Sequence, residues 1–273
     1  MPNAAHEPSR ARRRFALPLA VLLLVVLAAT AGARAITARA HYPTIRIMIV
    51  GKNGRVILPA RSITDAPATL KVEGHRCAVA AGTALAALAD LARAHVHLPL
   101  GLMAYEPCDT NPASAEGLFV ETIDGIHRDA AEKGTYNGWA YKVGNRGATA
   151  GAGSEKGPFG NGRKLSTGQD VLWFWCVYKG SLCQPTLGVS PAHTTARAGG
   201  KLDVKVDAYD ESGKGTPADG ATVTLGSQSA TAGATGRVQI TVPARAGRYL
   251  LSAHKRGLVT AFQRTIVVTA SGG

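Results

Sequence analysis

Hydrophobic and polar positions follow a different pattern in each of three parts of this chain, and the first part is one long apolar run. Apolar residues extend from Phe15 to about Ala33, directly after four arginines between positions 10 and 14. A basic stretch, an apolar run and then small-x-small sites, here at 33–35 and 38–40, are typical of an export signal. The run is also long enough to cross a bilayer. Residues 1–40 are therefore predicted to form a hydrophobic export helix, either a cleaved signal peptide or an uncleaved membrane anchor.

The second part, residues 41–189, begins with a hairpin pattern and continues with one helix pattern. TIRIMIVG (44–51) and GRVILP (54–59) flank an Asn-Gly turn, which predicts two paired strands. GTALAALADLA (82–92) has apolar residues at helical spacing after Thr83, a residue type that caps helices. It is the one strong helix pattern that follows the export segment.

Strand patterns return later in this second part. GWAYKVG (138–144) and VLWFWCVYKG (171–180) both read as strands, and the latter predicts a closing hairpin that turns at Lys179-Gly180. A glycine-rich stretch between them (144–163) predicts an exposed loop. One helix against a mainly antiparallel sheet predicts the α+β class for residues 41–189.

The third part, residues 190–273, consists of short alternating segments separated by glycine, proline and aspartate turns. This spacing predicts an all-β sandwich of the immunoglobulin-like (Ig-like) kind, with no helix. The residues predicted to face its core are Val204, Val206, Val223, Leu225, Val238, Ile240, Leu250 and Ile266.

Four cysteines in an exported chain predict two disulfides and a location outside the cytoplasm. A two-residue turn at Lys179-Gly180 would place Cys176 opposite Cys183, at a separation suited to a disulfide. Cys77 is then left to pair with Cys108. Because the sequence has no C-x-x-C pair, no zinc site is predicted.

The net charge of +13 is spread over the whole chain. No run of lysine or arginine occurs beyond the export segment, so nucleic acid is excluded as a partner, whereas a cell-surface polymer or protein fits. His75, His95 and His97 lack acidic or cysteine partners at ligand spacing, so no metal is predicted. No phosphate loop, dinucleotide fingerprint or nucleophile elbow is complete, and we predict no catalytic residue and no enzymatic activity.

Aromatic residues make up 5% of the chain but gather on two predicted strands. Alternation places Trp139 with Tyr141, and Trp173 with Trp175, each pair on one face of its strand. On one interpretation the helix and loops cover these faces. On the other, one face binds a flat ligand or a sugar by stacking, which makes these four residues the candidate ligand-binding site.

The motifs GW-x-Y at Gly138–Tyr141 and L-x-x-G-x-D-V-L-W at Leu165–Trp173 resemble a domain of unknown function that also forms the C-terminal β-domain of transcobalamin and intrinsic factor. The resemblance covers about residues 43–188, and it implies a β-grasp fold in a non-catalytic module of exported bacterial proteins. It also implies cobalamin as the one cofactor to consider. In this chain the helical partner domain of the vitamin carriers is missing, and Val143-Gly144-Asn145 replaces the family's VNG. Of its motif residues, Gly168 and Asp170 fit a turn.

PADGATVTLG and GRYLLSAHKRG, in the third part, resemble bacterial Ig-like or carboxypeptidase-regulatory-like domains, which act as spacers or adhesion modules. The sequence as a whole therefore predicts three parts: an export segment at 1–40, a β-grasp-like domain at 41–189 and an Ig-like domain at 190–273. We expect a non-enzymatic binding, adhesion or spacer protein, secreted or anchored in the cell membrane. The alternative is a module that stacks a corrinoid or a glycan on its aromatic residues.

Overall fold

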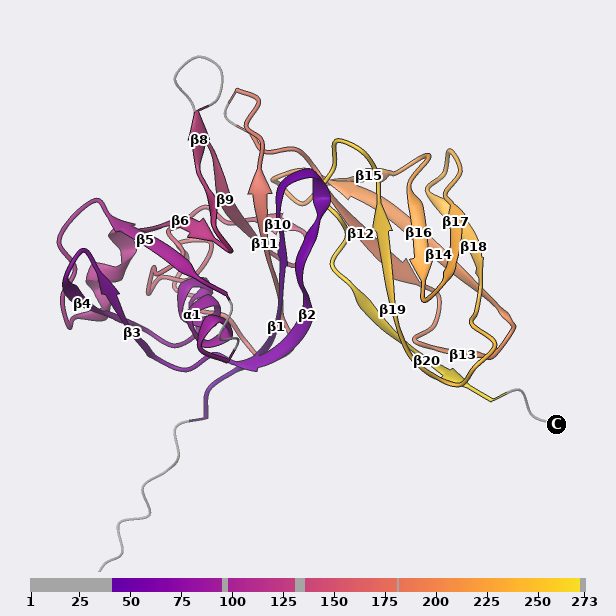
Figure 1. Ribbon diagram of the computed structural model, residues 1–273, viewed down its shortest axis with the longest axis horizontal. Coiled ribbons are helices and arrows are strands. Elements are labelled where there is room, and N and C mark those ends of the chain that lie inside the picture. The colour runs from indigo at the N-terminus through magenta and orange to yellow at the C-terminus, as the bar shows by residue number, and fades with distance from the viewer. Residues whose placement is uncertain (1–40, 95–97, 131–135, 181, 271–273) are drawn as a thin grey trace, which may run out of the picture. The chain divides into compact units, whose positions relative to one another are not determined.

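The computed structural model describes residues 41–94, 98–130, 136–180 and 182–270 (Figure 1). The described residues belong to one compact unit. The predicted export segment lies outside the described residues, as do His95 and His97. In the part of the chain that the structure describes, no helix is long and apolar enough to cross a membrane.

The largest sheet of the N-terminal half has the strand order β10-β9-β11-β1-β2, and β8 extends it beside β9. β1 runs parallel to β11, and the other neighbours are antiparallel. Its strands are β1 (Thr44–Val50), β2 (Val56–Thr64), β8 (Asp129–Ala130), β9 (Tyr136–Val143), β10 (Arg146–Gly147) and β11 (Asp170–Cys176).

The predicted first hairpin is confirmed. β1 and β2 pair through the short 3-10 turn η1 (Lys52–Gly54), in which Asn53 and Gly54 have φ angles of 57° and 73°. Asparagine and glycine are the residues that adopt this left-handed backbone conformation at low cost.

The predicted closing hairpin after β11 is wrong. β11 lies between β9 and β1, so no position beside it is open to the residues that follow. After β11, Lys179 instead pairs with Leu182 in an isolated antiparallel bridge. The long apolar run of VLWFWC reflects burial on both faces of a central strand, since every residue from Val171 to Cys176 is buried.

The predicted helix is confirmed as α1 (Ala84–Ala94), and the Thr83 hydroxyl accepts the Ala86 N–H at 3.2 Å as its N-cap. Two small sheets and a 3-10 helix complete this half of the chain. They are β3 (Ala68–Val72) with β4 (His75–Val79), β5 (Leu100–Ala104) with β6 (Leu118–Ile123) and β7 (Ile126–His127), and η2 (Pro112–Gly117).

The predicted α+β class with a β-grasp-like domain is wrong. Of the described residues, 49% lie in strands and 9% in helices, and α1 is the one α-helix among them. Segments without a clear period-2 pattern, such as 68–79 and 100–104, pair as strands, and they outweigh the short helix. The described chain is therefore mainly β.

The C-terminal part is an all-β sandwich of two sheets, as predicted, and its first strand is β12. The boundary between residues 189 and 190 stays a prediction. One sheet contains β12 (Thr186–Pro191), β14 (Lys201–Tyr209), β15 (Gly215–Pro217) and β18 (Arg237–Thr241). The other contains β13 (Thr195–Arg197), β16 (Thr222–Leu225), β17 (Gln228–Thr231), β19 (Gly247–His254) and β20 (Arg264–Thr269).

Most of the predicted core positions of this sandwich are buried, but one is shifted by a residue. Leu250 is 41% exposed, whereas its neighbour Leu251 is fully buried, and Val238 is only partly buried. Neighbouring strand residues face opposite sides, so a register error of one residue exchanges core for surface. The doublet Leu250-Leu251 leaves that register undecided in the sequence.

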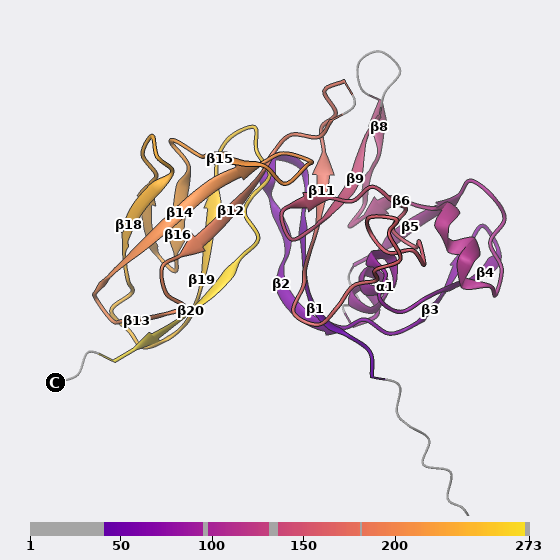
Figure 2. The same cartoon turned by 180° about the vertical axis from the view of Figure 1, so that it is seen from behind.

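The two faces of the largest sheet pack against different partners (Figure 2). Ile45, Ile47 and Ile49 of β1 face α1 in the main core cluster. Met48 and Val50, on the opposite face, pack with Val259 and Phe262 of the C-terminal part. The sheet is therefore covered on both sides, and the C-terminal part contributes to one of its two covers.

Candidate functional site: an aromatic cleft

Two adjoining cavities border β9, and together we call them the aromatic cleft. The first cavity has a volume of about 400 Å³ and the second about 310 Å³. Phe119, Trp139 and Tyr178 line both. Trp173 and Tyr141 line only the first cavity, together with alanines of the glycine-rich loop. The residues that line only the second cavity are Tyr105, Arg128, Tyr136, Asn137, Gly138 and Gly180.

The strand register decides which rings meet. β9 and β11 pair Trp139 with Trp175 and Tyr141 with Trp173, all on the face toward α1. The Tyr141 and Trp173 rings stack with their centres 5.1 Å apart, and Trp139 meets Trp175 edge to face at 5.7 Å. Cross-strand aromatic pairs of this kind stabilise a sheet.

The structure brings three of the four predicted site residues to the cleft. Trp139, Tyr141 and Trp173 line the first cavity, but Trp175 lines neither. Trp175 lies instead beneath Lys52, whose ammonium nitrogen is 4.5 Å from its ring centre. All four rings are less than a tenth exposed, so only their edges can reach a ligand. Their role in binding stays a prediction.

The polar groups of these rings differ in whether they have a hydrogen-bond acceptor. Trp139 Nε1 donates to the Ile126 carbonyl at 2.9 Å, and the Tyr141 hydroxyl donates to the Ala150 carbonyl at 3.1 Å. Burial raises the pKa of Tyr141 well above its usual range, so this hydroxyl keeps its proton. Trp173 Nε1, by contrast, is buried and has no acceptor among the residues that the structure describes. Such an unpaired buried donor costs free energy unless an acceptor reaches it.

Exposed tyrosines form the mouth of the cleft. Tyr105, Tyr136 and Tyr178 are 69%, 56% and 36% exposed, and all three line the second cavity. Leu182 of the first cavity is also exposed. The sequence placed Tyr178 in the aromatic cluster of the predicted closing hairpin but not in the site, and it missed Tyr105 and Tyr136, which lie at strand ends where no periodic pattern distinguishes them. Their exposure is the signal, and it exists only in the folded chain.

The second cavity is also lined by a positively charged side chain, that of Arg128. The Arg128 guanidinium carbon lies 5.2 Å from the centre of the Tyr136 ring and 6.0 Å from that of Phe119. These distances are in the range of cation–π contacts. The nearest charged partner is Glu121, whose Oε1 is 3.7 Å from Arg128 Nε.

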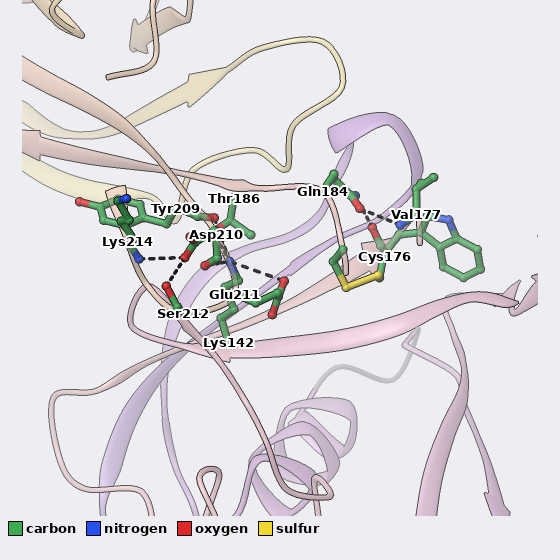
Figure 3. A network of polar contacts seen from close by, with 12 residues as sticks. Lys142, Cys176, Val177, Gln184, Thr186, Tyr209, Asp210, Glu211, Ser212 and Lys214 are labelled. Atoms are coloured by element: carbon green, nitrogen blue, oxygen red, sulfur yellow. Dashed lines mark hydrogen bonds and ion pairs between the residues drawn. A yellow bond between two sulfur atoms is a disulfide. The ribbon is translucent and has the colours of Figure 1, made fainter. Parts of the chain in front are cut away.

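The loop 177–183 is held at the cleft by a disulfide and by two side-chain amides. Gln184 accepts the Val177 N–H and donates to the Trp175 carbonyl, both at 2.7 Å, beside the Cys176–Cys183 disulfide (Figure 3). Asn137 accepts the Tyr178 N–H at 3.0 Å. These contacts fix Tyr178 over the cleft.

The structure contains both disulfides expected from the sequence. Cys77 is bonded to Cys108 and Cys176 to Cys183, with Cα atoms 5.2 and 5.1 Å apart. Two disulfides indicate an extracytoplasmic protein.

Replacing Cys176 and Cys183 together by serine is expected to lower the free energy of unfolding by roughly 2–3 kcal/mol, because the bridge closes only a short loop. The fold should persist while the 177–183 loop gains mobility, which hydrogen exchange of its amides would detect. Unchanged exchange in the double variant would contradict this prediction.

The glycine-rich stretch is only partly the exposed loop that the sequence predicts. Gly153 and Ser154 are buried, and a side chain at 153 would meet the Ala115 carbonyl at 2.3 Å from its Cβ. Gly168 has a φ of 88°, as a turn requires. Asp170 pairs with Arg46 at 2.6 Å and with Arg264 at 2.5 Å. Gly168 and Asp170 therefore have structural roles.

Metal ligands are not assembled in the part of the chain that the structure describes, where no group of three or more His, Cys, Asp or Glu side chains could hold an ion. His75 lies exposed on β4. The cleft itself contains aromatic rings, one arginine, one asparagine and Glu211. Its residue types suit binding by stacking, hydrogen bonds and charge.

These features define a mainly β, disulfide-bonded protein with an aromatic cleft. No protein-family model and no curated protein matches the chain, so the resemblance to the transcobalamin and intrinsic factor domain gains no support. Solved structures similar to the chain include the D00-D0 domain of intimin, at 13% identity over 55% of this chain and 89% of that one, with a TM-score of 0.23. Murine CEACAM1b is 11% identical over 84% of this chain and 100% of its own, with a TM-score of 0.20. Scores this low support no inference about fold or function.

Proposed function

We propose that this protein is a non-enzymatic binding module of the cell exterior that holds a saccharide chain in the aromatic cleft. The observation that carries the proposal is the set of exposed rings of Tyr105, Tyr136 and Tyr178 at the mouth of two adjoining cavities. Exposed apolar patches mark interaction sites, and ligand pockets are concave and lined largely by aromatic and hydrophobic side chains.

Saccharides fit both kinds of surface in this cleft. The C–H faces of a sugar ring pack against aromatic faces, while its hydroxyl oxygens accept hydrogen bonds from polar groups. Arg128 and Asn137 line the second cavity, and their N–H groups are of the kind that donates to sugar oxygens.

Binding is tested by calorimetric titration of the purified full-length protein with oligosaccharides from bacterial and plant cell walls. We expect saturable binding to at least one of them. Tyr178→Ala should weaken it about 5-fold, because one stacking contact contributes on the order of 1 kcal/mol. Tyr42→Ala, which changes a tyrosine that lines neither cavity, is the matched control and should bind like the parent protein.

Cyanocobalamin is the second ligand in the same titration. Saturable binding of cyanocobalamin that Tyr178→Ala abolishes, without binding of any saccharide, would replace the saccharide by a corrinoid. Binding of neither ligand class would reject a small-molecule role for the cleft and leave the adhesion or spacer function.

A further inference from the structure

We propose that the second cavity of the aromatic cleft binds the carboxylate of an acidic saccharide, a hexuronic acid unit, and that Arg128 pairs with it. This inference rests on the proposed function and names its ligand class. It depends on three features of the cavity: the unused hydrogen-bond donors of the Arg128 guanidinium, the two aromatic rings near it, and the space beside Gly138.

The Arg128 guanidinium has unused donors. It carries five N–H groups, and among the described residues none of them makes a hydrogen bond. Its one ion pair within the described part of the chain is with Glu121, at an Nε–Oε1 distance of 3.7 Å, which is longer than a hydrogen bond. The side chain is 31% exposed, so solvent and ligands can reach it. The terminal nitrogens are therefore available for a bidentate pair with a carboxylate.

The orientation of this guanidinium is fixed before a ligand arrives. Tyr136 and Phe119 both contact it, at 5.2 and 6.0 Å from the guanidinium carbon to the ring centres. Arginine that stacks on rings loses fewer conformations when it forms hydrogen bonds. A carboxylate on a sugar that lies against Tyr136 or Tyr105 would meet these nitrogens while the sugar ring stacks.

Gly138 lines the cavity and leaves space there that a side chain would fill. A Cβ at Gly138 would lie 3.8 Å from the Arg128 Cβ and 4.0 Å from the Phe119 ring, at ordinary contact distances. Its φ is not in the left-handed region, so the backbone accepts other residues there. A larger side chain at 138 would then occupy the space beside Arg128. Gly138→Leu is therefore a steric probe of the same site.

Charge favours an anionic ligand over a neutral one. Residues 41–273 carry 25 lysines and arginines against 17 aspartates and glutamates, and this positive excess raises the local concentration of anions. In the second cavity the charged lining residue is Arg128. A neutral saccharide could stack on the tyrosines but would not use this charge.

The test compares trigalacturonate with its fully methyl-esterified form, because the two share their rings and differ in charge. Calorimetric titration of the full-length protein should give at least a 10-fold lower Kd for the acid. Arg128→Gln should raise the Kd for the acid at least 10-fold and leave that for the ester unchanged, and Arg128→Lys should lie between. Gly138→Leu should weaken the binding of both the acid and the ester. Arg55→Gln, an exposed arginine paired with Asp124 at 3.5 Å, is the matched control and should change neither.

Equal affinity for acid and ester, or binding to Arg128→Gln as tight as to the parent protein, would overturn the inference and leave the proposed function intact. Binding of tri-glutamate as tightly as trigalacturonate would also overturn it, since the site would then recognise acidic peptides. Failure of every saccharide, neutral or acidic, would overturn the inference together with the proposed function. A melting temperature of each variant within a few degrees of the parent shows that loss of binding is not loss of fold.

Discussion

Replacing Asp65 by asparagine is expected to stabilise the protein at pH 8 and to leave its stability nearly unchanged at pH 4. Asp65 is fully buried, and neither carboxylate oxygen has a hydrogen-bond partner among the described residues. Burial raises the pKa of Asp65 from 3.8 to about 7; the nearby charge of Asp90 adds to this rise, while the Gly82 backbone and the charge of Lys164 oppose it. The folded protein therefore holds a proton that the unfolded chain releases near pH 4.

The sign follows from proton binding. Between pH 4 and pH 7 the folded state binds more protons at Asp65 than the unfolded state, so the free energy of unfolding falls as pH rises. The difference between a pKa of about 7 in the folded state and 3.8 in the unfolded chain corresponds to a loss on the order of 4 kcal/mol. Asparagine cannot ionise, so Asp65→Asn should remove this loss. The difference between variant and parent should then grow by about that amount from pH 4 to pH 8.

Urea unfolding of the full-length protein at both pH values measures this difference. Asp219→Asn changes an exposed aspartate on the C-terminal sandwich and serves as the control, with little expected effect at either pH. Parallel pH profiles for Asp65→Asn and the parent protein would show that Asp65 ionises normally in the folded state.

The second large effect is expected at Lys142, the buried lysine of β9. Its side chain is fully buried, and its Nζ donates to the Tyr209 and Asp210 carbonyls at 3.0 and 2.8 Å and to the Thr186 hydroxyl at 3.2 Å (Figure 3). Glu211 lies 3.8 Å away as its counter-ion. Burial lowers the pKa of Lys142, and Glu211 and Asp210 oppose that change. One side chain thus joins the largest sheet to the end of β14.

Lys142→Met is expected to lower the free energy of unfolding by about 3 kcal/mol, because it leaves the acceptors and the Glu211 carboxylate without their cation. Adding Glu211→Leu should restore part of this loss, since no unpaired charge then remains. Lys205→Met is the control, because the Lys205 side chain is 45% exposed in its pair with Asp207 and should contribute less than about 1 kcal/mol. Calorimetric melting measures all three, and a Lys142→Met protein as stable as the parent would show that the network contributes nothing net.

Neither Asp65 nor Lys142 could be identified from the sequence. Each is an ordinary polar residue in a strand or turn pattern, and charged residues of these types usually face solvent. Their burial depends on contacts with residues far away in the chain, such as Lys142 with Asp210. Long-range contacts of this kind leave no local signal.

The C-terminal sandwich could be predicted well because its strands alternate cleanly and its turns contain glycine and proline. The N-terminal half could be predicted only in part. The hairpin around Asn53 and the helix after Thr83 follow from local rules, namely a left-handed turn and an N-cap. The class was wrong because short strands such as β5 have no distinctive pattern, and their pairing is decided by the partner strand.

The sequence alone determined the local elements and the set of residues that could meet: one helix, alternating strands, two cysteine pairs and aromatic residues on β9 and β11. These depend on spacing along the chain, which the sequence contains in full. Only the tertiary structure decided that β11 is a central strand and that Trp175 lies outside the cleft. It alone also placed Tyr105, Arg128 and Tyr178 around one cavity. The physical reason is that burial and exposure are set by strand order and long-range packing, which no short segment encodes.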